Sequence, residues 1–445
     1  MKKRFAKKLM GLVAMLLVVA FVAACAREEG ATGGGGSGVV AQGITDDEIL
    51  VGATFVTAGA LAFIGLPIVD AFIAVIERVN AHGGVGGRQI RLIHYNDDND
   101  PIGGRILIER LVEEDQVFAL LGLSGVHAPT SLEYLRNFGI PVINITGGIA
   151  FMYHEYDPGS NIFLIQPSNE HDGPTMLARA LREPLFGPNH NERLPYGATI
   201  GLMFSNNDAG FDVNNGVMRL AEELGITDNI IAEVVTPETY FTVIQQMMDA
   251  GVDLLLVGSL DTIGITAAMS DAGWYVPVIG AYGTSTIQSH SPEVYHPNRR
   301  ILATTWAQYI TPGAQVMLAD MEDALRYHPG IDDDTRASYV DNNFARAGYF
   351  MAMTLVVGLE RMEASGLEWT WENFISIMES EYFDFYATPP FSFANGRRMG
   401  ITDLALFEYR AHMGPDGEWV EEQSLAAGFE SLDVMVADIL EHWGR

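Results

Sequence analysis

Short apolar runs alternate with amphipathic stretches along most of the chain, and this alternation limits it to an α/β fold. The runs ILVGATF (49–55) and VFALLGL (117–123) are apolar almost throughout, as are strands buried on both faces of a sheet. Between them, residues 65–84 carry apolar side chains at helical spacing and end in two glycines. Strand, helix and strand in repetition predict parallel sheets with helices on both faces.

The same pattern continues through the rest of the chain. Strands are expected over 49–55, 88–97, 117–123, 140–145, 161–167, 196–206, 229–237, 252–258 and 276–282, and residues 300–310 begin a more helical third section. Helices are expected over 65–84, 100–115, 128–139, 170–183, 210–224, 240–250, 262–272, 313–327 and 341–366. The chain of 445 residues is too long for one core, so we expect two α/β units. Ligands of such folds bind in a crevice beyond the carboxyl ends of the strands.

The first 24 residues have the composition of a secretory signal. Residues 1–10 carry five basic side chains and no acid, and residues 11–24 are apolar throughout. The apolar run is shorter than the roughly 20 residues that a spanning helix needs. It ends in VAAC, which resembles a bacterial lipobox, and this resemblance implies a diacylglycerol anchor on Cys25 after cleavage before it. The alternative is an ordinary signal in which the cysteine is incidental.

Residues 25–43 are rich in glycine and predict a flexible tether between this anchor and the body. We therefore expect the body to lie outside the cytoplasm, held at the membrane by its lipid anchor only. Cys25 is the only cysteine of the chain, so no internal disulfide is expected.

The charge of the chain excludes two classes of partner. The net charge is −31, and all 57 acidic residues follow Ala24. An acidic body repels nucleic acid and anionic lipid, so we expect it to bind neither.

Signatures of catalysis and of metal binding are missing. The sequence has no H-E-x-x-H, C-x-x-C, G-x-S-x-G or P-loop motif, and its 11 histidines have no ligand-like spacing. The acidic segment NDDNDPIG (96–103) does not fit a calcium loop, because the positions that need Gly and Glu hold Pro101 and Leu107. Instead Asp100 and Pro101 are suited to begin a helix. We expect no cofactor, no metal and no enzymatic activity.

Two loops that follow predicted strands carry candidate ligand-binding groups. In GLSGVHAPT (122–130), Ser124 and Gly125 precede a helix, where backbone N–H groups and a hydroxyl form a site for an anion such as a carboxylate. Ser124 could also serve as a plain helix cap. In NITGG (144–148), Thr146 can donate and accept, and Gly147 and Gly148 allow a ligand to approach the backbone. The alternative for this loop is a simple turn.

Four segments occur in the order and spacing of type I periplasmic binding proteins: GITDDEILVGATFVTAGALAFIG, NAHGGVGGRQIRLIHYNDDNDP, LLGLSGVHAPT and FGIPVINITGG. The chain resembles the leucine/isoleucine/valine-binding proteins that serve ABC transporters. This resemblance implies two doubly wound parallel-sheet lobes, joined by a hinge of three crossovers, that close around a small ligand. The boundaries it implies are 44–165 with 302–398 for lobe 1, 166–301 with 399–420 for lobe 2, and a helical tail over 421–445.

The resemblance also implies roles for individual residues. It places ligand contacts at Phe63, Ser124, Gly125, Val126, Thr146, Gly147, Gly148, Phe211, Asp261 and Tyr282, with Asn207 and Ser259 beside them. Amino-acid-binding members carry an acid where this chain has Tyr282, to pair with the ammonium of the ligand. Since a buried ammonium without a charged partner is costly, either Asp261 supplies the charge or the ligand is not an α-amino acid. Asp261 could equally cap a helix, and we slightly favour that role.

We therefore predict a monomeric, lipid-anchored solute-binding protein that passes an amino acid, amide or carboxylate to an ABC permease. One alternative is a sensory protein with the same lobes, which reports its ligand to a receptor. Another is a surface hydrolase, in which Ser124 and His127 would be nucleophile and base, but no third orienting group is visible.

Overall fold

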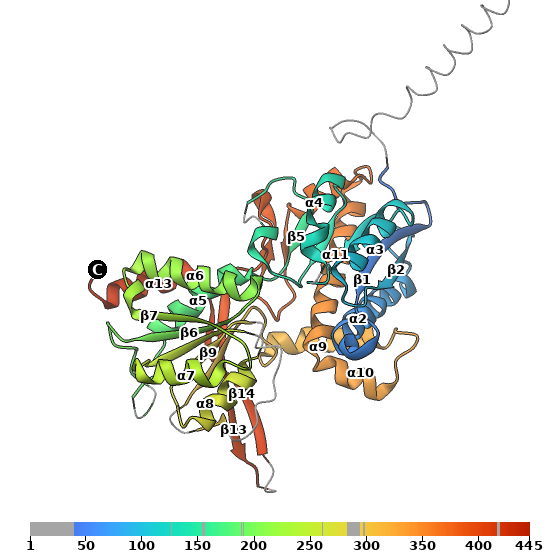
Figure 1. Ribbon diagram of the computed structural model, residues 1–445. Coiled ribbons are helices and arrows are strands. Elements are labelled where there is room, and N and C mark those ends of the chain that lie inside the picture. The colour runs from blue at the N-terminus through green and yellow to red at the C-terminus, as the bar shows by residue number, and fades with distance from the viewer. Residues whose placement is uncertain are drawn as a thin grey trace, which may run out of the picture. The chain divides into compact units, whose positions relative to one another are not determined.

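The computed structural model describes residues 40–445 except 126, 154–155, 188, 190, 260, 283–293, 297–298 and 416–418. The predicted signal, Cys25 and most of the predicted tether lie outside this part of the chain, as does Val126. The described residues form two large sheets with helices on both faces (Figure 1).

The first sheet has five parallel strands in the order β2-β1-β3-β4-β5. Its strands are β1 (Glu48–Phe55), β2 (Gln89–Asn96), β3 (Ala119–Leu121), β4 (Val142–Asn144) and β5 (Ile162–Leu164). Its larger helices are α2 (Ala62–Ala81), α3 (Pro101–Glu113), α4 (Ala128–Phe138), α9 (Pro312–Leu325), α10 (Asp333–Val340), α11 (Asn343–Ser365) and α12 (Trp371–Met378). Short elements complete this lobe: η1 (Gly59–Leu61), η2 (Ala150–Met152), β11 (Tyr382–Phe383), β12 (Phe391–Ser392) and η6 (Ala394–Gly396).

Each face of the first sheet has its own hydrophobic core. Side chains of α2 and α11 pack on one face, and side chains of α3 and α4 pack on the other. Helix α2 is long and apolar enough to cross a membrane, but half of its apolar stretch is buried within this core. The predicted start of α3 is confirmed, since Asp100 Oδ1 accepts a hydrogen bond from the Ile102 N–H at 3.0 Å and Pro101 is the first helical residue.

The second sheet has seven strands in the order β14-β13-β10-β9-β8-β6-β7. They are β6 (Ile200–Ser205), β7 (Ile230–Val235), β8 (Leu254–Gly258), β9 (Val278–Gly280), β10 (Ile301–Thr305), β13 (Leu404–Met413) and β14 (Trp419–Glu430). The helices are α5 (Asn169–Arg182), α6 (Asp208–Leu224), α7 (Tyr240–Asp249), α8 (Thr262–Asp271) and α13 (Leu432–His442), with the short η3 (Thr227–Asn229).

Both faces of this sheet are covered as well. Leu254 and Leu256 of β8 pack with α5, α6 and α13, whereas Leu255 and Val257 pack on the opposite face with α7 and α8. This alternation explains why the strand is apolar at every position. Helices α5 and α6 pack so closely that only glycine fits between them. A Cβ on Gly173 would stand 2.3 Å from the Val213 oxygen.

The C-terminal part of the chain differs from the prediction in two ways. Strands β13 and β14 form an antiparallel hairpin that joins β10, so the second sheet is mixed rather than wholly parallel. The predicted helical tail from residue 421 is wrong for its first ten residues, which belong to β14, and the helix begins only at Leu432.

The chain passes between the two sheets three times, after β5, after β10 and before β13. The first and third crossings pair with each other: the Leu164 N–H donates to the Arg398 oxygen at 2.9 Å, and the Gly400 N–H donates to the Leu164 oxygen at 2.8 Å. Because β10 belongs to the second sheet, the second crossing follows Thr305, whereas the prediction placed 302–305 in lobe 1.

Candidate functional site

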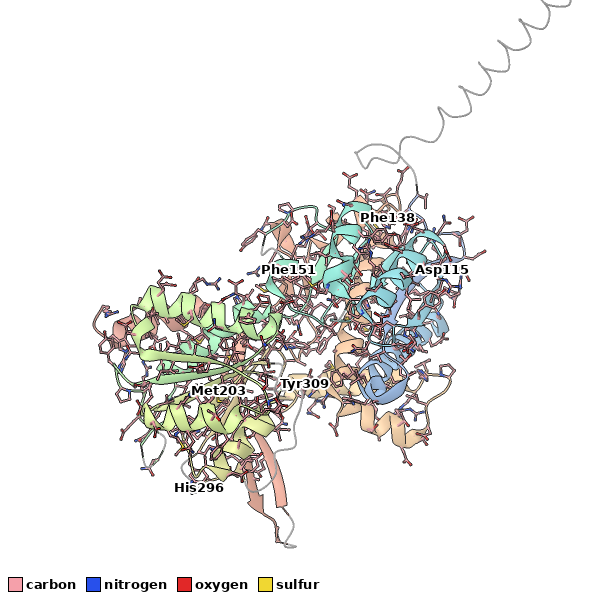
Figure 2. The ribbon with its side chains drawn as sticks, in the orientation of Figure 1. Asp115, Phe138, Phe151, Met203, His296 and Tyr309 are labelled. Carbon is pink, nitrogen blue, oxygen red and sulfur yellow. The ribbon has the colours of Figure 1, made fainter. Side chains whose placement is uncertain are left out.

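A cavity of about 290 Å³ lies where these crossings meet the ends of the strands. Its walls come from the loop after β4, the first crossing, the residues after β9 and β10, and the first turns of α6 and α11. The lining residues are Ile145, Thr146, Gly147, Gly148, Gln166, Asn169, Ala209, Tyr282, Thr305, Trp306, Ala307, Tyr309, Asn343, Phe344, Ala347 and Phe407. Tyr309 is labelled in Figure 2. The position follows the general rule that ligands of α/β folds bind beyond the carboxyl ends of strands.

The loop after β4, residues 145–148, forms one wall of the cavity and is called the glycine loop. Gly147 has a φ of 63°, and a Cβ there would stand 3.2 Å from the Gly125 Cα, so the loops after β3 and β4 touch through their backbones. The buried side chain of Asn144 fixes both loops, since its Oδ1 accepts from the Leu123 N–H at 3.1 Å and from the Thr146 N–H at 3.2 Å. The sequence NITGG thus places Thr146, Gly147 and Gly148 at the cavity surface.

Tyr282 forms the facing wall, and its hydroxyl is held on both sides. It accepts from Gln166 Nε2 at 2.8 Å and donates to Asn169 Oδ1 at 3.1 Å. Its backbone N–H donates to Asp172 Oδ2 at 2.7 Å, and the Thr304 hydroxyl donates to the other oxygen of Asp172 at 2.6 Å. Asp172 therefore ties α5 to the ends of β9 and β10, directly behind the cavity.

Burial raises the pKa of the Asp172 carboxyl from 3.8 to about 7, and the hydrogen bonds from Thr304 and Tyr282 oppose this rise. The folded protein then binds more protons than the unfolded chain between about pH 4 and pH 7. The contribution of Asp172 to the unfolding free energy is complete below the pKa that this carboxyl has in the unfolded chain. It is lost as the pH rises through the pKa of the carboxyl in the folded protein. Between pH 5 and pH 8, we expect the unfolding free energy of the wild type to fall by about 2 kcal/mol more than that of Asp172→Asn, because asparagine cannot ionise. Urea unfolding at both pH values measures this, and equal losses in the two proteins would refute it.

Aromatic side chains make up the third wall. Trp306, which follows β10, packs edge-on against Phe350 with ring centroids 5.4 Å apart. Phe344, at the start of α11, contacts the exposed Phe63 in the same manner at 6.3 Å. The predicted residue Phe63 does not itself line the cavity, but it continues the apolar wall outward from Phe344.

The other predicted site residues lie at varying distances from the cavity wall. Ser124 is almost buried, and Gly125 contacts Gly147, but neither lines the cavity. Phe211 is exposed on α6 and packs on Phe204, beyond the lining residue Ala209. Asp261 caps α8, because its Oδ1 accepts from the Gly264 N–H at 2.9 Å. The capping role favoured for Asp261 is therefore confirmed, and its carboxylate is not part of the wall. Likewise, Asn207 caps α6.

The arrangement around His127 does not suit a hydrolase. His127 is fully buried, and its Nε2 lies 2.9 Å from Thr54 Oγ1 and 3.1 Å from Asp97 Oδ2. Within the described part of the chain, no hydrogen bond joins Ser124 to His127. The imidazole therefore serves the packing of α3, α4 and β1 rather than a nucleophile.

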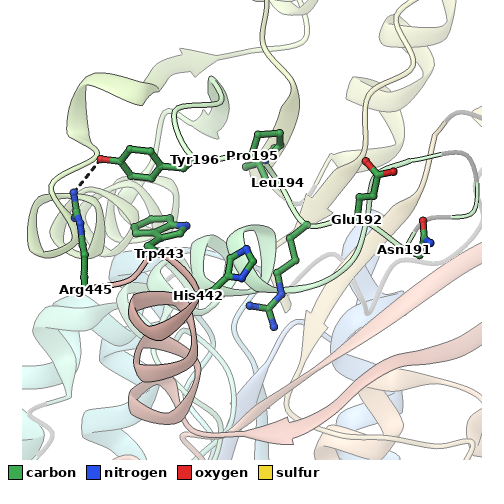
Figure 3. A pocket seen from close by; sticks show the side chains of 9 residues that line it. Asn191, Glu192, Leu194, Pro195, Tyr196, His442, Trp443 and Arg445 are labelled. Atoms are coloured by element: carbon green, nitrogen blue, oxygen red, sulfur yellow. Dashed lines mark hydrogen bonds between the residues drawn. The ribbon is translucent and has the colours of Figure 1, made fainter.

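A larger hollow of about 720 Å³ lies at the end of α13 (Figure 3). Arg445 donates to the Tyr196 hydroxyl at 2.9 Å there, and the ring of Tyr196 meets Trp443 edge-on. None of the residues predicted to bind ligand lines this hollow. The cavity beside Thr146 and Tyr282 is therefore the candidate site.

Several residues of this site did not stand out in the sequence: Gln166, Asn169, Thr305, Trp306, Tyr309, Asn343 and Phe344. Four of them lie at the end of a strand or in the loop after it, so the rule about strand ends could have found Gln166, Thr305, Trp306 and Tyr309. Asn343 and Phe344 come from the start of a helix far along the chain, and only the folded structure brings them to the cavity.

Comparison with known proteins agrees with this architecture. A family model described as "Periplasmic binding protein" matches residues 48–415. The Leu/Ile/Val-binding protein homolog 4 of Brucella abortus (strain 2308) is 21% identical over 251 residues, which are 52% of this chain and 56% of that protein. The chain thus matches little more than half the length of these curated relatives.

Solved structures of similar fold cover most of the chain. A fatty acid ABC transporter substrate-binding protein from Thermomonospora curvata is 17% identical, with a TM-score of 0.63 over 88% of this chain and 95% of that one. A substrate-binding protein from Desulfitobacterium hafniense in complex with Leu is 15% identical, with a TM-score of 0.59 over 84% of this chain and 100% of that one. A solute-binding protein from R. palustris in complex with 4-hydroxybenzoate is 16% identical, with a TM-score of 0.63 over 86% of this chain and 97% of that one.

Proposed function

Because the chain belongs to the periplasmic binding protein family, we propose that it is a lipid-anchored extracytoplasmic solute-binding protein of an ABC transporter. It captures one small molecule between its two lobes and delivers it to the permease. It binds this molecule without chemical change.

The observation that carries this proposal is the composition of the cavity wall. The first lobe contributes the glycine loop and the start of α11, and the second lobe contributes Ala209 and Tyr282. A ligand that touches both lobes stabilises the closed arrangement more than the open one, because only closure completes its contacts. The cavity volume of about 290 Å³ is near the lower end of the range for ligand pockets, which is about 300–1,000 Å³. This volume favours a small solute.

The glycine loop supplies groups for a carboxylate or an amide. In the described structure, the Gly147 and Gly148 N–H groups donate no hydrogen bond. Backbone N–H groups that converge at a cavity wall bind anionic or carbonyl oxygens. The similar structures named for fatty acid, Leu and 4-hydroxybenzoate fit such a role, since all three ligands are carboxylic acids.

A thermal-shift screen of amino acids, amides, and aliphatic and aromatic acids tests the proposal. A ligand present at 100 times its Kd should stabilise the protein by about 2.7 kcal/mol, which gives a clear rise in Tm. Esterase and amidase assays of the same protein should show no turnover. A screen in which no compound raises the Tm, or turnover that depends on Ser124, would contradict the proposal.

The anchor can be tested separately. We expect Cys25→Ser to move the protein from the membrane fraction to the soluble extracytoplasmic fraction, because acyl chains are then no longer attached. Ligand binding should be unchanged, since the cavity is built from residues 145–407. If the Cys25→Ser protein stays in the membrane fraction to the same extent as the wild type, a different anchor holds it.

A further inference from the structure

The wall of the candidate cavity offers no charge to a ligand. None of the described lining residues is acidic or basic, and their polar groups are amides, hydroxyls and backbone groups. An ammonium that enters such a space gives up its hydration without gaining a counter-charge, and this is strongly unfavourable. A carboxylate is better served, because Gly147 and Gly148 line the same space and their backbone N–H groups donate no hydrogen bond within the described part of the chain.

Tyr282 cannot act as the missing counter-charge. Its hydroxyl accepts from Gln166 and donates to Asn169, so both neighbouring amides are already engaged. Burial raises the pKa of this phenol well above 10, so the group is neutral at physiological pH.

Three acidic side chains of the second lobe are engaged in other contacts. Asp172 is buried and accepts from the Tyr282 N–H and the Thr304 hydroxyl. Asp261 accepts from the Gly264 N–H and the Tyr240 hydroxyl. Asp212 accepts from the Ala150 N–H at 2.7 Å. None of the three is among the residues that line the cavity.

A positive charge lies directly behind the aromatic wall. The Arg346 guanidinium stands 4.0 Å from the centre of the Tyr309 ring and donates to Asn343 Oδ1 at 3.1 Å. The Arg346 side chain is only 9% exposed, whereas that of its partner Asp341 is 89% exposed, so water weakens their ion pair. The cation already on Tyr309 disfavours a second one, and this argues against an aromatic cage for a quaternary ammonium.

From this geometry we propose that the cavity selects small organic acids or amides with an apolar body and no ammonium group. The carbonyl or carboxylate end lies against Gly147 and Gly148, and the apolar body lies against Trp306, Phe344 and, further out, Phe63. This inference rests on the proposed function and names the ligand class of that same site.

Calorimetric titration of the purified full chain with matched compounds tests the inference. L-Phenylalanine and 3-phenylpropionate differ only in the ammonium, as do L-leucine and 4-methylpentanoate; 3-phenylpropionamide and choline complete the panel. We expect each acid to bind at least tenfold more tightly than its amino acid, and choline not to bind. Equal or tighter binding of the amino acids, or binding of choline, overturns the inference and leaves the proposed function standing. If nothing in the panel or in the wider screen binds, the proposed function fails, and the inference fails with it.

Asn169→Asp provides a matched variant. Asn169 Oδ1 already accepts from the Tyr282 hydroxyl, so an aspartate keeps this bond while it adds a negative charge to the wall. Asn169 is the first residue of α5, where a negative charge is favourable, so the variant should fold. We expect its affinity for 3-phenylpropionate to fall at least tenfold and its preference over phenylalanine to shrink. Asn229→Asp adds the same charge at the end of η3, just before the amino end of the edge strand β7 and away from the carboxyl strand ends that border the cavity, and it should leave both affinities unchanged. An Asn169→Asp protein with the wild-type preference overturns the inference.

Discussion

Gly148→Ala should weaken ligand binding at least tenfold in a protein that still folds. A Cβ at this position would stand 2.8 Å from the Tyr282 hydroxyl oxygen and 3.1 Å from Gln166 Nε2. Gln166 Nε2 donates to the Tyr282 hydroxyl, which in turn donates to Asn169 Oδ1, so a shift of either atom disturbs this chain of hydrogen bonds in the cavity wall. Overpacking of this kind costs about 1–3 kcal/mol, and here the cost falls on the binding-competent arrangement. Titration with the best compound of the thermal-shift screen should show a loss of at least tenfold in affinity.

Gly428→Ala is the control for this variant. Gly428 lies in β14, its φ is not positive, and a Cβ there would meet nothing within 4 Å. We expect wild-type affinity and a wild-type Tm. If Gly148→Ala binds as tightly as Gly428→Ala, the glycine loop and Tyr282 do not form the ligand site.

The second large effect concerns the stability of the lobe that carries Tyr282. Arg179 of α5 is fully buried, and its guanidinium donates to the Leu404 oxygen at 2.7 Å, the Gly428 oxygen at 2.6 Å and Glu183 Oε1 at 2.7 Å. It thus joins α5 to β13 and β14. Arg179→Met leaves the buried Leu404 carbonyl, the partly buried Gly428 carbonyl and the Glu183 carboxylate without this donor, so we expect the unfolding free energy to fall by about 3–5 kcal/mol.

Arg326→Met is the matched comparison, because Arg326 also pairs with a glutamate four residues away on its own helix. Both members of that pair are exposed, and such pairs contribute about 0–1 kcal/mol. Urea unfolding of the two variants should therefore differ by several kcal/mol. Similar losses in both variants would mean that Arg179 does not fix the hairpin to α5.

Strand and helix positions in the first 300 residues could be predicted because most strands there are buried on both faces, although the edge strands β2 and β7 are more exposed. Residues such as Leu254–Gly258 are apolar at every position, so the pattern needs no knowledge of neighbours. The structure of the last part of the chain was harder to predict. Strand β14 contains Glu421, Glu422, Ala426 and Ala427, which favour helix by propensity, and it is a strand because it pairs with β13.

The candidate site could be predicted in part for a similar reason. Thr146, Gly147, Gly148 and Tyr282 directly follow strands, and all four line the cavity. The aromatic wall could not be predicted, because Phe344 reaches the site only through the packing of α11 on the first sheet. The absence of Asp261 from the wall could be predicted in part, since its position before a helix suits a cap and it accepts a local hydrogen bond from the Gly264 N–H.

A crystal structure of the protein with the compound that gives the largest rise in Tm tests the central claim most directly. We expect one ligand molecule, with its carboxylate or amide at Gly147 and Gly148 and its apolar part between Trp306 and Phe344. A ligand bound instead in the hollow beside Tyr196 and Trp443, with the cavity at Tyr282 empty, would contradict this account.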